Sequence, residues 1–218
     1  MKNERRLRSE IVDIGQRLYE KGFVASAEGN ISARLDKRRI LITPSGACKG
    51  MLRPQDLLVL DTSGEPLRHM NSRRPSSEMP MHLLCYRLRP EVNAVVHAHP
   101  PTATGFAVAG VTLDRPLIPE IVIALKRVPL APYATPGSAE LSAILEPLLR
   151  HHDALLMANH GVVTCGRDLM TAYLNMETVE QFARITLAAR LAGTPRELDS
   201  AEVERLLQLR SRFSSRTK

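Results

Sequence analysis

The chain has 218 residues, 44% of them hydrophobic, which is enough to bury one core, so we predict a single domain over residues 1–218. Its net charge of +7 would suit nucleic acid, but four Phe, four Tyr and no Trp leave few surfaces for stacking bases, and we expect no nucleic-acid partner. No apolar run is long enough to cross a membrane and the first residues are charged, which favours a cytoplasmic protein with no membrane partner.

Hydrophobic periodicity predicts helices and strands that succeed one another irregularly. The early strands come in hairpin-like pairs, so we predict an α/β fold whose sheet is covered by helices on both faces. The middle of the chain, residues 111–133, contains four prolines, and its path is not predicted. In chain order, the expected elements are a helix over 5–21, strands over 31–35, 39–43 and 57–60, a helix from 76 to 90, a strand over 93–99, a helix over 101–109, a helix over 138–150, a strand over 154–158, and helices over 169–191 and 200–213.

Three histidines lie at the ends of two predicted strands. His97 and His99 alternate at the end of one apolar run, so their rings should point to the same face of the sheet. His160 follows a second apolar run and precedes Gly161. A single buried histidine is more often a packed core residue, but three neutral imidazoles with an open position form the ligand set of a catalytic zinc ion.

Three short polar loops, residues 28–30, 43–46 and 76–78, combine small residues with hydroxyl or amide donors. Each is an ordinary turn or helix cap when taken alone, but together with the histidines they indicate a site for a phosphate group. Glu78 lies in the first turn of a predicted helix, where a carboxylate beside a substrate carbon could act as a general base. His82, one turn later, could be a fourth ligand, but we interpret it as a residue of the helix face.

Six motifs in order resemble the class II aldolase/adducin family, whose best-known members are the fuculose-1-phosphate aldolases. The resemblance covers roughly residues 7–191. The motifs are G-N-I-S-x-R over 29–34, T-P-S-G over 43–46, S-S-E-x-x-x-H over 76–82, V-x-H-x-H-P-P over 95–101, P-Y-A-T-P-G over 132–137 and N-H-G over 159–161.

The resemblance implies a three-layer α/β/α domain with a largely antiparallel central sheet, assembled as a homotetramer with active sites at the subunit interfaces. It implies a small phosphorylated sugar as substrate and Zn²⁺ as cofactor, with Mn²⁺ or Co²⁺ as alternatives. By position in the motifs, His97, His99 and His160 match the metal ligands and Glu78 matches the acid/base carboxylate. The positions that match the family's phosphate-binding residues are Gly29, Asn30, Ser45, Gly46, Ser76 and Ser77.

The implied reaction is the reversible cleavage of a ketose 1-phosphate to dihydroxyacetone phosphate and an aldehyde. The aldolases also carry a tyrosine that exchanges the proton of the aldehyde oxygen, but residues 117–123 contain none, and Glu120 is the candidate replacement. Relatives that use the same zinc site are sugar-phosphate 4-epimerases, dehydratases and decarboxylases, which stay open as alternatives. A scaffold of the adducin type, without chemistry, usually lacks the metal ligands that this chain retains.

Overall fold

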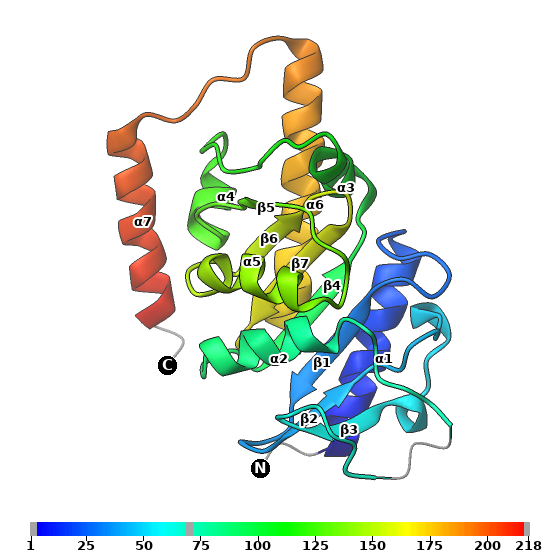
Figure 1. Ribbon diagram of the computed structural model, residues 1–218. Coiled ribbons are helices and arrows are strands. Elements are labelled where there is room, and N and C mark those ends of the chain that lie inside the picture. Colours follow the sequence, from blue (N-terminus) through cyan, green and yellow to red (C-terminus); the bar gives the residue numbers. More distant parts are fainter. Residues whose placement is uncertain (1–3, 69–71, 216–218) are drawn as a thin grey trace.

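A mixed seven-stranded sheet forms the centre of the molecule (Figure 1). The computed structural model describes residues 4–68 and 72–215, with side chains as far as Arg210. The strand order is β3-β2-β1-β4-β7-β6-β5, and all neighbours are antiparallel except β5 and β6, which are parallel. The strands are β1 (Asn30–Arg34), β2 (Arg39–Ile42), β3 (Leu58–Asp61), β4 (Ala94–Ala98), β5 (Leu130–Ala131), β6 (Ala154–Met157) and β7 (Gly161–Gly166).

Helices cover both faces of this sheet, as predicted. The helices are α1 (Glu4–Glu20), α2 (Met79–Leu88), α3 (Pro101–Val108), α4 (Pro119–Ala124), α5 (Ala139–Leu149), α6 (Leu169–Ala192) and α7 (Ser200–Ser215), with short 3₁₀ turns η1 (Lys49–Met51) and η2 (Pro54–Asp56). Helices α1, α3, α4, α6 and α7 contribute to one hydrophobic cluster, whereas α2 and α5 contribute to the other. The two clusters use alternate residues of the same strands, because successive side chains on a strand point to opposite faces.

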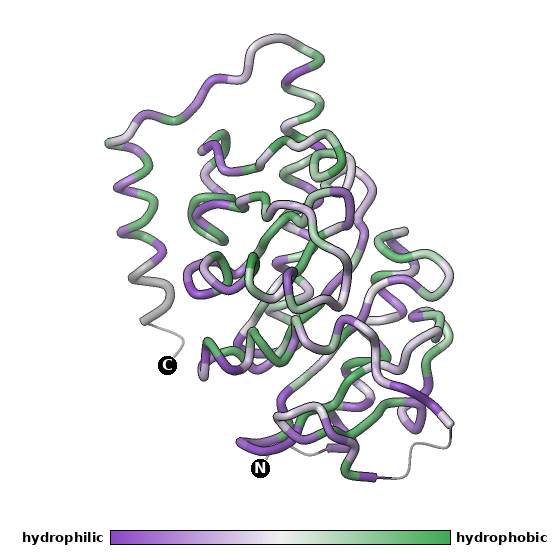
Figure 2. The backbone as a smooth tube through the Cα atoms, viewed as in Figure 1, coloured by the Kyte–Doolittle hydropathy of each residue, from purple (hydrophilic) through white to green (hydrophobic). Residues whose placement is uncertain are grey.

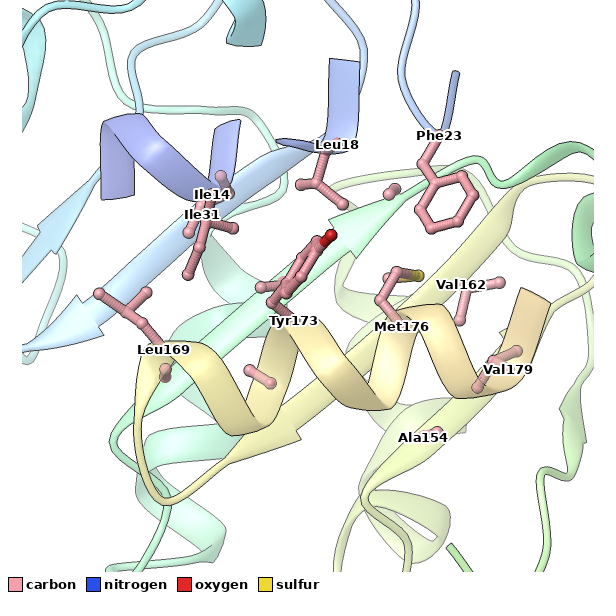
Figure 3. Packing of buried hydrophobic residues seen from close by; sticks show 14 of the residues in the cluster. Ile14, Leu18, Phe23, Ile31, Ala154, Val162, Leu169, Tyr173, Met176 and Val179 are labelled. Carbon is pink, nitrogen blue, oxygen red and sulfur yellow. The ribbon is translucent and has the colours of Figure 1, made fainter. Parts of the chain in front are cut away.

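The longest helix, α6, packs against one face of the sheet and against α1. Figure 3 shows Tyr173 and Met176 of α6 pointing toward Leu18 of α1, Ile31 of β1 and Val162 of β7. All five side chains are at most 2% exposed. Burial of a side chain of this size contributes about 1.5–3 kcal/mol, so this layer holds β1, β4 and β7 in place behind the histidines.

The predicted strands and helices are present, but three elements were not predicted. Only three residues separate the end of β6 from the start of β7, because Asn159 adopts a left-handed conformation (φ 55°) that permits a tight hairpin. The middle segment contains the short helix α4, which begins at Pro119, and the two-residue strand β5. Elements this short carry too little periodicity to be recognised from the sequence.

Hydropathy follows the layers. Figure 2 shows hydrophobic residues along the central strands and an alternation of hydrophobic and hydrophilic residues along α7. The alternation agrees with the packing of α7, whose Leu206 is buried against the first cluster. Among the described residues, no helix is long and apolar enough to cross a membrane.

Candidate active site

The three histidines meet at one end of the sheet. His97 is the fourth residue of β4, His99 follows that strand, and His160 lies in the turn between β6 and β7. Strand β4 runs antiparallel to β7, so the end of β4 lies beside the beginning of β7. The ring centroids are 4.7–5.3 Å apart, and one ring nitrogen from each histidine lies within 4.8 Å of the others.

The nitrogen atoms that face one another fit a divalent metal ion. His97 Nδ1 is 2.9 Å from the carbonyl oxygen of Val162, and a carbonyl only accepts, so Nδ1 carries the proton and Nε2 keeps a lone pair. That Nε2 atom is 3.1 Å from His99 Nε2. Burial and the neighbouring His97 and His160 hold the pKa of His99 well below its ordinary value, so its ring is neutral too. Lone pairs that converge in this way can hold a cation between them, and neutral imidazoles are ligands that zinc prefers.

Glu78 stands beside this cluster at the start of α2. Its Oε2 atom is 3.1 Å from His97 Nε2, and its Oε1 atom is 3.1 Å from His160 Nε2. Burial alone would raise the pKa of Glu78, but the neighbouring His97 and His160 rings outweigh it and hold the pKa well below its ordinary value. The carboxylate is therefore anionic and lies within reach of any group held by the three rings.

A chain of buried hydrogen bonds orients Glu78 from behind. His82 Nε2 contacts Asn30 Oδ1 at 2.5 Å, and the Asn30 amide nitrogen donates to Glu78 Oε2 at 2.9 Å and to Ser76 Oγ at 3.0 Å. Because Asn30 Oδ1 only accepts, His82 carries its proton on Nε2, and Nδ1 accepts from Ser32 Oγ at 2.7 Å. Burial, with a further contribution from His97, lowers the pKa of His82 to about 3 and keeps it neutral.

His82 was predicted to lie on the helix face, but it is fully buried beneath Asn30. It is not part of the group of three histidines that could hold a metal ion. His82 lies on the face of α2 that packs against the sheet and not on the solvent face. The sequence does not show this, because a short helix with a weak amphipathic pattern does not distinguish its buried face from its exposed face.

The three polar loops also come together. The Thr43 hydroxyl accepts from the Ile31 backbone N–H at 3.1 Å, so loop 43–46 lies against the start of β1, directly after Gly29 and Asn30. The Ser45 N–H donates to the Arg74 carbonyl at 2.8 Å, which places the second loop beside the third. Ser45, Gly46 and Ser77 are exposed, whereas Ser76 and Asn30 are buried.

Two glycines allow this close packing. A Cβ atom on Gly161 would lie 2.5 Å from the His99 ring and 2.7 Å from the Ala98 carbonyl oxygen. Gly29 adopts a left-handed conformation (φ 69°), and a Cβ there would lie 2.7 Å from the His97 carbonyl oxygen. Glycine is required at both positions because the backbone approaches the histidines too closely for a side chain.

Glu120 lies elsewhere. It is an exposed residue of α4 and lines a cavity of about 560 Å³ together with Lys21 of the loop after α1 and Glu177 and Arg184 of α6. None of the three histidines lines this cavity. A role for Glu120 in the reaction would therefore require the site of a neighbouring copy of the chain.

Some residues around the site were given no role of their own by the sequence, although Glu28 belongs to the predicted polar loop 28–30. The Glu28 carboxylate is 3.5 Å from His99 Nδ1, and the Val162 carbonyl orients His97. Lys49 is buried close to two of the polar loops. The place of Glu28 next to the Gly29–Asn30 motif could have indicated that it lies at the site. The Val162 carbonyl and Lys49 lie outside every motif, so nothing in the sequence indicates their position.

The fold and site define a class of protein: a mixed sheet, covered by helices on both faces, with a histidine cluster at one end. Residues 9–187 match the family described as "Class II Aldolase and Adducin N-terminal domain". The chain belongs to this family.

The chain is also similar in sequence to enzymes of known name and in structure to solved proteins. The chain is 36% identical over 189 residues to a 3-oxo-tetronate 4-phosphate decarboxylase of Pectobacterium atrosepticum, covering 85% of each chain. It is 32% identical over 180 residues to an L-fuculose phosphate aldolase of Methanocaldococcus jannaschii, covering 83% of this chain and 95% of the relative. The crystal structure of YgbL from Escherichia coli is similar to it with a TM-score of 0.85 and 33% identity, covering 93% of this chain and 98% of the other.

Proposed function

We propose that the chain is a metal-dependent lyase that breaks the bond between the α- and β-carbons of the carbonyl group in a phosphorylated sugar or sugar acid. The observation that carries this proposal is the meeting of three imidazole nitrogens with the Glu78 carboxylate, at a point where His97 and Glu78 are buried and His99 and His160 are half-buried. The same family contains lyases with aldolase and decarboxylase names among the relatives of this chain.

His97, His99 and His160 are the residues that would hold the ion, which we propose to be Zn²⁺, with Mn²⁺ or Co²⁺ as alternatives. When bound, such an ion supplies a Lewis acid that withdraws electrons from the substrate carbonyl. The Val162 carbonyl contributes by fixing the tautomer and the ring orientation of His97.

Glu78 is the residue that we assign to proton transfer. Cleavage of the bond leaves an enediolate, and the carboxylate exchanges a proton with the carbon that has lost its substituent. Asn30 and His82 hold the carboxylate in position through hydrogen bonds, so that it does not have to reorient during the reaction.

We assign the phosphate group of the substrate to the exposed ends of the three polar loops, with Gly29, Asn30, Ser45, Gly46, Ser76 and Ser77 as the proposed binding positions. Ser45, Gly46 and Ser77 are exposed and lie on neighbouring loops, which suits a ligand that enters from solvent. The Asn30 amide already donates to Glu78 and Ser76, so its side chain contributes mainly by ordering the site. Binding energy at the phosphate is remote from the reacting carbon and fixes the register of the substrate.

Two reactions fit this site. Retro-aldol cleavage of a ketose 1-phosphate and decarboxylation of a 3-oxo-tetronate 4-phosphate both leave the enediolate of dihydroxyacetone phosphate. The aldolase reaction needs a second group that removes a proton from the hydroxyl that becomes the aldehyde, whereas loss of CO₂ does not.

A specific observation favours the decarboxylase as a second candidate of equal standing. Residues 117–123 contain no tyrosine, and Glu120 lines a cavity that none of the three histidines lines. A reaction that needs no second base is compatible with a chain that has no tyrosine at residues 117–123. Epimerase and dehydratase chemistry has no such support.

The decisive experiment supplies purified enzyme with Zn²⁺ and either fuculose 1-phosphate or a 3-oxo-tetronate 4-phosphate, and measures dihydroxyacetone phosphate with and without chelator. We expect chelator-sensitive release of dihydroxyacetone phosphate from at least one substrate. A protein that binds no metal and stays folded and inactive on both would instead be a scaffold of the adducin type.

A further inference from the structure

Lys49 is a buried cation next to the proposed phosphate site. It begins the 3₁₀ turn η1, is only 1% exposed, and ranks among the largest fully buried side chains. Among the residues that the structure describes, no carboxylate lies within ion-pair distance of its ammonium group. Burying an ammonium group without a counter-charge is strongly unfavourable, so the protein is expected to use the charge.

The ammonium group joins two of the three polar loops. Nζ donates to the Ala27 carbonyl oxygen at 3.0 Å and to the Ala47 carbonyl oxygen at 2.6 Å. Ala27 lies two residues before Gly29, and Ala47 directly follows Gly46. An ammonium group has three N–H donors, and the described residues provide acceptors for only two of them.

We propose that Lys49 is a positioning residue that supplies the positive charge of the phosphate site: its ammonium group holds loops 28–30 and 43–46 together, and the phosphate of the substrate neutralises it. This inference rests on the proposed function, because it assigns the phosphate to these loops. Loop N–H groups alone offer only partial charges, whereas a fixed cation beside them selects a phosphorylated substrate over its uncharged analogue.

The charge state of Lys49 provides a test with a defined sign. Burial lowers the pKa of Lys49 to about 8, and the nearby Cys48, Glu78 and Glu28 side chains oppose this shift. Phosphate binds the protonated amine, so its affinity is complete below pH 8 and is lost as the pH rises above 8. Inorganic phosphate completes its second ionisation near the lower end of this range, and the added negative charge can only strengthen binding to a cation, so a fall in affinity above pH 8 reports the amine.

The experiment is calorimetric titration of the full chain with inorganic phosphate, with chelator present so that phosphate cannot bind through a metal ion. For the parent, we expect the affinity to fall about tenfold between pH 7.5 and 9.5. Lys49→Met removes the charge at similar volume and should weaken phosphate binding at pH 7 by about tenfold or more. Lys37→Met, at an exposed position in the turn between β1 and β2, makes the same charge change and should bind phosphate like the parent.

Lys49→Arg restores a cation that does not titrate, and we expect it to bind phosphate with an affinity that is flat from pH 7.5 to 9.5. Equal phosphate affinity of Lys49→Met and the parent, a flat profile in the parent, or no phosphate binding by the parent would each overturn the inference. If Lys49→Met fails to fold, the pH dependence of phosphate affinity in the parent tests the inference by itself. Because this titration involves no turnover, a chain that binds phosphate through Lys49 yet cleaves no sugar phosphate would refute only the proposed function.

Discussion

At the scale of single residues, the site separates metal binding from proton transfer. His99 contributes a ring nitrogen to the histidine cluster, whereas Glu78 faces the cluster with a carboxylate. We predict that His99→Ala abolishes metal uptake and turnover together. Glu78→Gln should keep the metal but lower kcat by about a hundredfold or more, because the amide cannot exchange the proton. Metal content by atomic spectroscopy and kcat from the same samples check both statements, and normal turnover by both variants would refute the assignment.

His82 has a measurable role that differs from that of a ligand. His82→Phe fills the same space but leaves Asn30 Oδ1 without its donor, so Asn30 can rotate away from Glu78. We predict that this variant retains one metal ion and loses about tenfold in kcat, with little change in KM. Tyr86→Phe removes only the outermost hydroxyl, which is 2.7 Å from Ser32 Oγ, and serves as the matched control with a smaller loss. A loss of metal in His82→Phe would show that His82 acts through the metal site instead.

At the scale of secondary-structure elements, a carboxylate of α6 fixes the helix that follows His99. Glu180 is 1% exposed and accepts from the Thr102 N–H at 3.2 Å and the Ala103 N–H at 2.9 Å, at the first turn of α3. The negative charge therefore satisfies free donors at a helix start and ties α3 to α6 across the core.

Glu180→Ala should destabilise the protein by about 2–3 kcal/mol, because it leaves the buried N–H group of Ala103 and the half-buried N–H group of Thr102 without their acceptor. Urea denaturation measured by circular dichroism provides the free energy of unfolding. Glu197→Gln, which alters an exposed carboxylate paired with Arg115, is the control and should unfold close to the parent. Equal stability of Glu180→Ala and the parent would mean that solvent replaces the carboxylate at this helix start.

At the scale of the whole molecule, Glu120, the candidate for a second proton-transfer group, lies away from the histidines of its own chain. Glu120 lines a separate cavity between α4 and α6, so it could act only in the site of another subunit. We propose a homotetramer with active sites at the interfaces, in which Glu120 of one subunit faces the histidines of the next. Sedimentation of the purified protein measures the oligomeric state directly.

Mixed tetramers test the role of Glu120. His99→Ala and Glu120→Gln should each be inactive as an aldolase, but a mixture refolded together should regain activity at about a quarter of its sites. In such a site, one subunit supplies intact histidines and its neighbour supplies an intact Glu120. Full aldolase activity of Glu120→Gln by itself would instead show that Glu120 is not the second base.

Much of the molecule could be predicted from local pattern. The apolar spacing of Leu7, Ile11, Ile14 and Leu18 predicted α1, and all four are buried in the first cluster. The alternation of His97 with His99 at the end of an apolar run predicted that both rings would meet, and the structure brings them together with His160. These features depend on residues that are neighbours along the chain or at a regular repeat, so the sequence carries them directly.

What only the tertiary structure decided depends on contacts between distant segments. The order of the strands, the pairing of the two-residue strand β5 with β6, the burial of His82 beneath Asn30 and the contact of the Lys49 ammonium group with Ala27 all join residues far apart in the chain. No local periodicity encodes such pairings, because a strand or a buried polar group is satisfied by whichever partner the packing of the whole domain supplies. The sequence by itself thus determined which groups can do chemistry, and the folded core determined which of them face one another.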